Sequence, residues 1–401
     1  MPLLPTASVV YHTLRQALND RVARAWRSAA HRQRKLRVGV DIRPFYEPLT
    51  GVGWYLYYLL HELAKRDDVE LYLFGDARVT DDGPFLHADL PENAKLCTFD
   101  LRGQSLSRLS RPMTAAAYVV WMSLADCDVF FGANYFLPRL HAAVARRRVV
   151  TVHDLTYKRF PELLQKETLE NLDRQMQREV AMADAIVCVS ESTRRDLLRY
   201  YDADPSRVHA ILSGLGTPAV AEPIDGLPSR YILFVSTIEP RKNLGTLIDA
   251  WERIRGSYDG ALVVVGKVGW KSESLVPRLR GKGIVHLDYV PAAQLATIYE
   301  RAEAFVFPSI YEGFGFPLLE AMARGVPSLA ARSSSLPEIG GDAALYFEPT
   351  DADALTAQLR RVLHDPALRA ELAKRGRAQA ARFLWSDAAE KTFAVLRRAA
   401  D

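Results

Sequence analysis

Short apolar segments alternate with amphipathic helical patterns along most of this chain, and this alternation limits the fold more than any other feature. In the first half, the pattern predicts strands at residues 37–41, 69–74, 95–99, 128–131, 149–152, 185–189 and 208–212. Apolar strands separated by helices are typical of a parallel sheet that helices cover on both faces. The first half is therefore predicted to be an α/β domain.

The same alternation starts again after a stretch rich in glycine and proline, residues 214–229, which we interpret as a linker. Strands are predicted at 231–235, 262–265, 284–287, 304–307 and 327–329, and helices at 244–255, 292–301, 318–324 and from about 351 onward. The predicted fold class is thus α/β, with two Rossmann-like, doubly wound parallel-sheet domains facing a cleft. Ligands of such sheets bind beyond the carboxyl ends of the strands, so we expect the chemistry in that cleft.

Charge is distributed unevenly along the 401 residues. Residues 1–37 contain eight cations and one acid, whereas the whole chain has a formal net charge of +4, so the other 364 residues sum to −3. Nucleic acids are bound by clustered cations, so a body this close to neutrality is not expected to bind them. The three cysteines are scattered, and the longest apolar run, residues 115–125, is shorter than the ~20 residues that span a bilayer. Because the start lacks the pattern of a secretory signal, a cytoplasmic protein is expected.

The basic N-terminal segment has the pattern of an amphipathic helix within residues 1–35. Apolar residues recur there at helical spacing, with arginines on much of the other side: Val10, Leu14, Leu18, Val22, Trp26 and Ala29. Such a helix can lie on an anionic membrane surface, here through residues 8–35. The alternative is a helix that packs on its own domain or forms a dimer contact.

A strand, a glycine-containing loop and a helix are predicted from residue 307 to residue 327, with the sequence FPSIYEGFGFPLLEAMARGVP. Pro317 suits the first helical turn, where its missing N–H would have no partner. Free N–H groups and partial positive charge make this helix start an anion site, which we assign to Phe314, Gly315, Phe316 and Leu318. Glu312 in the loop and Glu320 in the helix are placed to bracket a ligand. The alternative is that Glu312 caps the helix and Glu320 is solvated.

A second motif, residues 235–244, follows the first strand of the second domain and opens a helix; its sequence is VSTIEPRKNL. Arg241 and Lys242 are adjacent cations at a strand end beside a helix start, a combination suited to a diphosphate. The alternative is a solvated basic turn in which Asn243 caps the helix.

Together these two motifs resemble the retaining GT-B-fold glycosyltransferases that use nucleotide-sugar donors, in particular the family 4-like group of bacterial mannosyl- and glucosyltransferases. The resemblance covers about residues 36–400. It implies that Glu312 contacts hydroxyls of the donor sugar, that Glu320 contacts the ribose and that Lys242 contacts the diphosphate. Many members have an arginine six positions before this lysine, where this chain has Ser236. Arg241 is the candidate replacement for that phosphate-binding cation.

The resemblance also implies a division of labour between the domains. The acceptor-binding domain is expected to comprise residues 36–213 together with a C-terminal helix, about 386–401, that returns to it. The nucleotide-sugar-binding domain is expected to comprise residues 230–385.

Glycines mark a further candidate site in the first domain. Residues 48–57 follow the first predicted strand and begin a helix, and Gly51 and Gly53 would let the backbone approach a phosphate closely. The segment is not a dinucleotide fingerprint, because Leu56 occupies the third glycine position. The alternative is an ordinary turn between strand and helix.

Two more segments of the first domain follow predicted strands. The resemblance places His153 near the reacting sugar, and the alternative is a structural histidine that Asp154 orients. Residues 190–193 have the pattern of a helix cap, and a ligand contact there is the second interpretation.

Asp-x-Asp pairs, which can hold a metal that carries a diphosphate, occur at 126/128, 202/204 and 351/353. They fall before a strand, in a turn and at a helix start, so each has a structural interpretation. We therefore expect no essential metal, and no cofactor besides the nucleotide-sugar co-substrate.

The implied activity is transfer of a hexose, mannose favoured, from a nucleoside-diphosphate sugar to a hydroxyl of a glycan or lipid-linked acceptor. The expected setting is bacterial surface polysaccharide or glycolipid synthesis, in the cytoplasm or peripherally on the inner face of the cytoplasmic membrane. His153, Glu312 and Lys242 are the expected catalytic residues. GDP-mannose is the favoured donor, because residues 239–243 are similar to those of several GDP-mannose enzymes. The alternatives are a UDP-sugar-dependent glucosyl- or N-acetylglucosaminyltransferase, an epimerase or phosphorylase, and a non-catalytic nucleotide-sugar-binding scaffold.

Overall fold

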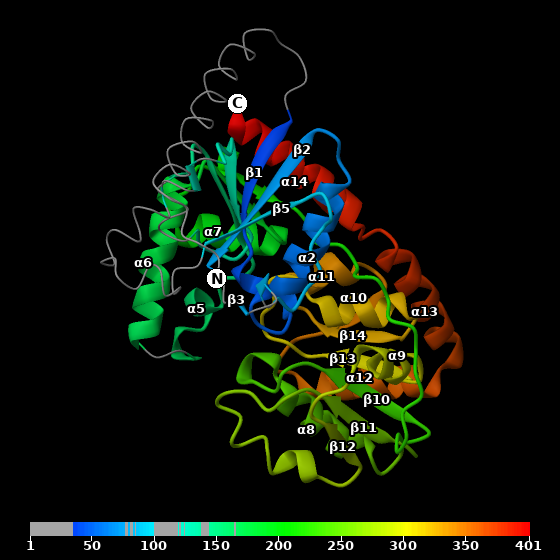
Figure 1. Ribbon diagram of the computed structural model, residues 1–401. Helices are drawn as coiled ribbons and strands as arrows, with labels where there is room; N and C mark the ends of the chain where they lie inside the picture. Colours follow the sequence, from blue (N-terminus) through cyan, green and yellow to red (C-terminus); the bar gives the residue numbers. More distant parts are fainter. Residues whose placement is uncertain are drawn as a thin grey trace.

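The computed structural model in Figure 1 contains two parallel sheets flanked by helices. It describes residues 35–76, 79–80, 83–84, 86–99, 119, 122–123, 125–137, 144–163 and 166–401. The amphipathic helix expected within residues 1–35 lies outside this range, except for Lys35. No helix in the described ranges is both long enough and apolar enough to cross a bilayer.

The N-terminal sheet has seven strands in the order β5-β2-β1-β6-β7-β8-β9, and neighbouring strands are parallel. Its strands are β1 (Leu36–Asp41), β2 (Val69–Asp76), β5 (Lys95–Phe99), β6 (Val129–Gly132), β7 (Arg148–Val152), β8 (Ala185–Cys188) and β9 (Val208–Ala210). Val38 of β1 pairs with Leu71 and Val129, and all three side chains are buried. Each strand predicted for the first half is present, because burial on both faces requires continuous apolar runs. A short antiparallel pair, β3 (Val79–Thr80) and β4 (Gly83–Pro84), is an addition to the prediction.

Helices of the first domain carry the segments that reach the cleft. They are α2 (Gly51–Ala64), α5 (Thr156–Arg159), α6 (Lys166–Met182) and α7 (Glu191–Tyr200). Helix α2 buries Leu56, Leu59, Leu60 and Leu63, whose spacing places them on one face of a helix. This apolar face fixes α2 on the domain, so the N-terminal end of α2 stands at the carboxyl edge of the sheet.

The C-terminal sheet has six parallel strands in the order β12-β11-β10-β13-β14-β15. Its strands are β10 (Tyr231–Val235), β11 (Ala261–Val265), β12 (Ile284–Leu287), β13 (Ala304–Phe307), β14 (Ser328–Ala331) and β15 (Ala344–Phe347). The helices are α8 (Leu244–Ile254), α9 (Ala292–Glu300), α10 (Phe316–Ala323), α11 (Leu336–Gly340), α12 (Ala352–His364) and α13 (Pro366–Ala380). Strand β15 is missing from the prediction; it is a short edge strand, four residues long, in which Leu345 and Tyr346 are partly exposed.

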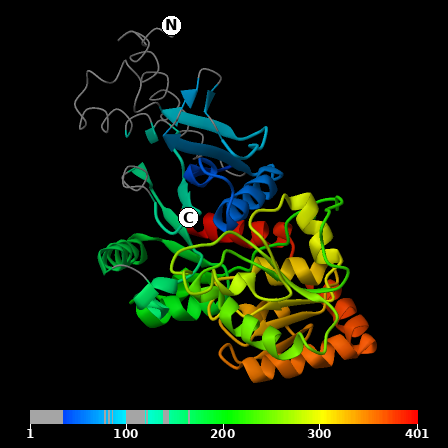
Figure 2. The same ribbon diagram turned by 90° about the horizontal axis from the view of Figure 1, so that it is seen from below.

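The chain crosses between the domains twice, and the two crossings lie together. After α13, helix α14 (Trp385–Ala400) returns to the first domain and packs on α2. Both views show the red α14 beside the blue α2 (Figures 1 and 2). Where α14 begins, the amide of Leu215 in the linker donates to the carbonyl of Phe383 at 2.8 Å. The two domains are thereby joined at one edge and face each other across the rest of their boundary.

Candidate active site

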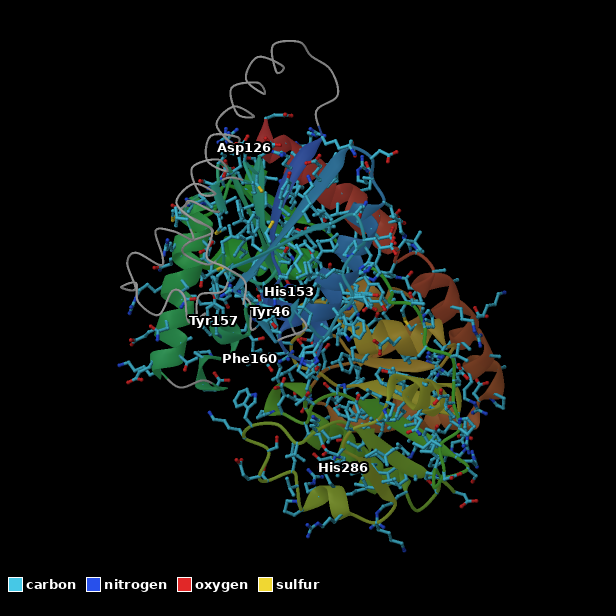
Figure 3. All side chains as sticks on the ribbon, in the orientation of Figure 1. Tyr46, Asp126, His153, Tyr157, Phe160 and His286 are labelled. Atoms are coloured by element: carbon cyan, nitrogen blue, oxygen red, sulfur yellow. The ribbon has the colours of Figure 1, made fainter. Side chains whose placement is uncertain are left out.

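A cavity of about 1180 Å³ lies between the domains at the carboxyl ends of both sheets. The first domain contributes the start of α2 and the residues after β7, and the second contributes the loops after β10 and β13. The cavity contains most of the predicted site residues: Gly51, His153, Ser236, Arg241, Lys242, Glu312, Phe314, Gly315, Phe316 and Glu320. Figure 3 shows His153 in the middle of the molecule, at the level where the domains meet.

Glu312 is a buried carboxylate in the loop after β13, with 8% of its surface exposed. It accepts hydrogen bonds from Lys242 Nζ at 2.6 Å, Arg241 Nη1 at 3.0 Å and Ser309 Oγ at 2.5 Å. Burial alone would raise the pKa of Glu312, but the positive charges of Lys242 and Arg241 together outweigh burial and lower this pKa to about 2. Glu312 is therefore an ionised acid held by two cations.

Lys242 and Arg241 come from the 3₁₀ turn Pro240–Lys242 that follows β10. Arg241 also donates to the Tyr311 carbonyl at 2.8 Å and, through Nη2, to Glu239 Oε1 at 2.8 Å. Burial alone would lower the pKa of Arg241, but the negative charges of Glu312 and Glu239 outweigh burial and raise this pKa above its ordinary value. Arg241 therefore stays positively charged. The solvated basic turn considered from the sequence is wrong, because Lys242 is only 9% exposed and both cations are paired. Both face the cavity while bound to acids of this chain.

Asn243 occupies the position before α8 with a left-handed backbone, φ 54°. Its side chain does not cap the helix, so that interpretation is wrong. Instead, Asn243 Nδ2 donates to the carbonyls of Pro308 at 3.0 Å and Pro349 at 2.6 Å. Asn243 thus joins the turn of Lys242 to the start of the loop that carries Glu312.

Glu320 lies on α10 and faces the same cavity. Tyr299 donates its hydroxyl to Glu320 Oε2 at 3.2 Å, and burial raises the pKa of Glu320. Glu320 is partly buried, so the alternative considered from the sequence, a solvated Glu320, is wrong. Glu312 does not cap α10 either, because Gly315 occupies the N-cap position with φ 118° and no side-chain cap is formed.

Leu318, one of the predicted site residues, lies away from the cavity. Its side chain is fully buried, and its amide donates to the Gly315 carbonyl at 3.1 Å. The Leu319 amide makes a similar bond to the same carbonyl at 3.3 Å. The part of this helix start that lines the cavity is therefore limited to Phe314, Gly315, Phe316 and Pro317.

The two glycines at the start of α2 have different surroundings. A Cβ at Gly51 would meet Phe316 Cδ2 of the second domain at 3.9 Å, so Gly51 faces across the cleft. A Cβ at Gly53 would come within 2.9 Å of Leu49 Cδ2, and Gly53 lines a neighbouring cavity instead. Close packing accounts for Gly53, whereas Gly51 belongs to the wall of the interdomain cavity.

His153 follows β7 and is held by a backbone carbonyl. Its Nε2 lies 2.7 Å from the Ala133 carbonyl oxygen, which requires the proton on Nε2, and its ring packs edge-on against Tyr55 at 4.9 Å. Burial lowers the pKa of His153, which favours the neutral ring. The alternative, in which Asp154 orients this histidine, is not what the structure shows: the hydrogen bonds of the Asp154 side chain run to the Thr156 amide, at 3.1 Å, and to the Tyr135 side chain.

Three residues that sequence reasoning missed connect the domains beside the cavity. Tyr311, next to Glu312, donates its hydroxyl to Asp196 of α7 at 2.8 Å and accepts from the Leu155 amide at 3.2 Å. Glu338 of α11 accepts from the amides of Glu191 at 2.8 Å and Ser192 at 2.6 Å, at the start of α7. Nothing local in the sequence signals these bonds, since each joins residues more than 100 positions apart.

Gly313 also was not singled out from the sequence, although it lies within the glycine loop. A Cβ at this position would overlap the carbonyl oxygen of His153. The loop of Glu312 can therefore approach the first domain only with glycine at position 313. Ser190, in contrast, caps α7 as predicted, its Oγ accepting from the Thr193 amide at 3.1 Å.

The Asp-x-Asp residues serve local structure. Asp204 accepts from the Ser206 amide at 2.9 Å, and Asp351 caps α12 through the Ala354 amide at 2.8 Å. Asp126 forms an ion pair with Arg146 and lies at the far end of the first domain from His153 (Figure 3). Within the described ranges, no three acidic, histidine or cysteine side chains gather as metal ligands. That the protein needs no metal stays a prediction.

Comparisons with known proteins agree with this architecture. The family model described as Glycosyl transferases group 1 matches residues 225–379, and the model of Glycosyltransferase Family 4 matches residues 49–217. The chain is 32% identical over 378 residues to O-antigen chain mannosyltransferase B of Escherichia coli, covering 87% of this chain and 96% of the relative. It is 31% identical over 268 residues to an MMP alpha-(1->4)-mannosyltransferase of Mycolicibacterium hassiacum, covering 65% of this chain and 64% of the relative.

The fold also matches that of solved structures. Sucrose-phosphate synthase of Thermosynechococcus elongatus superimposes with a TM-score of 0.70 at 21% identity, covering 91% of this chain and 99% of that structure. The two sheets, the interdomain cavity and the relatives lead to one conclusion. The chain belongs to the GT-B-fold glycosyltransferases of the family 4 type and is a glycosyltransferase.

Proposed function

We propose that this enzyme transfers a mannosyl group from GDP-mannose to a saccharide hydroxyl, with retention of configuration, in the synthesis of a bacterial surface polysaccharide. The observation that carries the proposal is the buried cluster of Glu312, Lys242 and Arg241, which faces a cavity that a second carboxylate, Glu320, also lines. The name of the Escherichia coli relative, an O-antigen chain mannosyltransferase, supports mannose and the polysaccharide setting.

Donor binding is an exchange of partners within this cluster. The diphosphate takes the place of the Glu312 carboxylate on Lys242 and Arg241, because both groups are anions that accept hydrogen bonds from the same cations. Glu312 is then available to accept hydrogen bonds from the sugar hydroxyls, and Glu320 accepts from the ribose. This exchange keeps both cations paired with an anion before and after binding, and it leaves the Glu312 carboxylate hydrogen-bonded to Ser309 Oγ and the sugar hydroxyls.

Transfer breaks the bond between the anomeric carbon and the β-phosphate oxygen and forms a bond from that carbon to the acceptor oxygen. Negative charge grows on the departing diphosphate, where Lys242, Arg241 and the start of α10 at Phe316 stabilise it. The acceptor approaches on the face that the phosphate leaves, and its proton passes to a phosphate oxygen. His153, neutral and fixed by the Ala133 carbonyl, positions the sugar opposite Glu312. No metal or further cofactor takes part in this proposal.

An assay with a panel of sugar nucleotides as candidate donors tests the proposal directly. The purified protein is incubated with GDP- and UDP-sugars, with and without an acceptor extract, and release of the nucleoside diphosphate is followed. Acceptor-dependent release from GDP-mannose, lost in folded Glu312→Gln and Lys242→Met variants, is expected. Nucleoside diphosphate release from UDP-sugars but not from GDP-mannose would contradict GDP-mannose as the donor and favour the UDP-sugar alternative. Tight donor binding without turnover would contradict catalysis and favour a nucleotide-sugar-binding scaffold.

Contact with the cytoplasmic face of the membrane through residues 8–35 is the second part of the proposal. It is supported by the net charge of +7 in residues 1–37, which attracts anionic lipid. Sedimentation with anionic vesicles is compared for the full chain and a variant lacking residues 1–35. Equal sedimentation of the two proteins would contradict membrane contact through this segment.

A further inference from the structure

A second cavity, of about 780 Å³, lies in the first domain beside the donor cavity. Thr50, Val52 and Tyr135 line both cavities, so the two spaces meet at the start of α2. The remaining walls come from the turn after β1, the loop after β6 and one face of α6. A molecule bound here would lie next to the sugar that Glu312 holds.

Arginines provide the positive charge of this second cavity. Arg174 and Arg178 lie one turn apart on α6, both exposed. In the described part of the chain, neither forms an ion pair with an acid, although Arg178 Nε contacts Met182 Sδ at 3.5 Å. Arg43 stands on another wall, paired with the buried Asp41 at 2.8 Å. Arg174 and Arg178 therefore differ from Lys242 and Arg241, which are paired with acids of this chain.

Two acids also line the second cavity, and their surroundings differ. Glu47 is exposed and is available to accept hydrogen bonds from sugar hydroxyls. Glu179 is buried and accepts from the Leu137 amide, and burial raises its pKa. Helix α2 begins at this cavity with no side-chain cap and with no acid in its first turn, so its partial positive charge adds to that of the arginines.

Tyr135 forms the partition between the cavities. Its backbone is left-handed, with φ 55°, its amide donates to the Thr151 carbonyl at 2.9 Å and its side chain is hydrogen-bonded to Asp154. A tyrosine held in a strained backbone conformation is typical of functional sites. It offers an aromatic face against which a sugar ring can pack at the junction with the donor cavity.

We infer that the second cavity binds the acceptor, and that Arg174 and Arg178 recognise a phosphate or diphosphate group that the acceptor saccharide carries. The inference rests on the proposed glycosyl transfer and names the acceptor class. The sugar lies at Tyr135 with its hydroxyl toward the donor, and the phosphate lies toward α6. Guanidinium groups bind phosphate through paired hydrogen bonds, which Arg174 and Arg178, exposed and in no ion pair with a described acid, are free to make. A soluble glycosyl phosphate and a lipid-linked glycosyl diphosphate share this chemistry.

The test is a binding measurement with the donor cavity filled. GDP is kept at saturation, and the Kd values of three probes are measured by calorimetry: decyl mannoside, decyl diphosphate-linked mannose and methyl diphosphate-linked mannose. We expect the charged probes to bind at least about tenfold more tightly than the neutral one. In the Arg174→Gln/Arg178→Gln variant this difference disappears. Arg199→Gln, a change on α7 that lines neither cavity, leaves it intact.

The arms of the test separate the possible results. Equal Kd values for neutral and charged probes in the wild-type enzyme, or the same loss in Arg199→Gln, would overturn the inference. When the arginines matter, tighter binding of the decyl than of the methyl diphosphate indicates a lipid-linked acceptor, and equal binding indicates a soluble one. Because binding needs no turnover, a protein that binds charged probes through Arg174 and Arg178 but transfers nothing would contradict the proposed function alone. Equal transfer to neutral and charged acceptors would contradict this inference alone.

Discussion

The two neighbouring cavities hold their positive charge in opposite ways. In the donor cavity, Lys242 and Arg241 are largely buried and paired with Glu312 and Glu239. In the second cavity, Arg174 and Arg178 are exposed and form no ion pair with a described acid. A buried charge needs an opposite charge beside it even when no ligand is bound, whereas water stabilises an exposed charge until a ligand binds. These charges thus suit an exchange of partners in the interdomain cavity and direct attraction of an anion in the second cavity.

Lys242→Met gives the largest effect expected from this difference. It leaves Glu312 buried with one cation fewer and removes a donor to the diphosphate. We expect kcat to fall about 10²–10³-fold and the free energy of unfolding to fall by about 3–5 kcal/mol. Activity assays with saturating donor and urea unfolding measure the two changes. Lys65→Met, which removes a lysine paired with Glu62 at the surface, is the matched control. If Lys242→Met lost no more activity and no more free energy of unfolding than Lys65→Met, the proposed difference between buried and exposed ion pairs would be contradicted.

The pH dependence of stability is the next largest effect. The folded pKa of Glu312 is about 2, against an ordinary 4.5, so its ion pairs stabilise the fold fully above pH 4.5. This contribution is lost as the pH falls from about 4.5 through about 2, and it amounts to roughly 3 kcal/mol. Urea unfolding at pH 6, 4.5 and 3 should therefore show a smaller acid-induced loss for Glu312→Gln than for the wild type. Parallel loss in both proteins would show that Glu312 is not the titrating group.

Tyr311→Phe tests the bonds that join the donor loop to the first domain. Without the hydroxyl, the buried Asp196 loses its donor, so we expect a loss of about 1–3 kcal/mol in the free energy of unfolding. We also expect that, in the absence of a nucleotide sugar, the two domains of this variant move apart. Small-angle X-ray scattering would then give a larger radius of gyration. Tyr289→Phe, at a tyrosine that is 73% exposed, is the control. An unchanged radius of gyration would mean that Tyr311 does not hold the domains together.

The smallest expected effect is on the stability of the acceptor-side variants. Arg174→Gln and Arg178→Gln should each change the free energy of unfolding by less than about 0.5 kcal/mol, because both side chains are exposed and unpaired with described acids. The same urea series measures this change. A loss comparable with that of Lys242→Met would show that the two cavities do not differ as described.

The second-domain residues that line the interdomain cavity could be located from the sequence because their signals are local. Strand β13, the glycine loop, Glu312 and Glu320 lie within one short segment, and the apolar run before them fixes where the loop begins. The pairing of Glu312 with Lys242 could not be predicted, since it joins residues 70 positions apart. The Asn243 side chain was misassigned for the same reason: its acceptors, the carbonyls of Pro308 and Pro349, come from distant loops.

The second cavity gave no motif in the sequence because its wall is assembled from separate elements. In the sequence, Arg174 and Arg178 occupy polar positions typical of an amphipathic helix, and Tyr135 lies in a segment without a regular pattern. The fold brings them together with the start of α2 at one cavity. Periodicity predicts each element, but the juxtaposition depends on strand order, which places β6 next to both β1 and β7.

A crystal structure with bound GDP-mannose, or with GDP and mannose, tests the central claim most directly. The account predicts diphosphate oxygens within hydrogen-bonding distance of Lys242 Nζ, with the Glu312 carboxylate turned from that lysine to hydroxyls of the sugar and Glu320 at the ribose. A nucleotide bound elsewhere, with the pair between Lys242 and Glu312 intact at 2.6 Å, would contradict it.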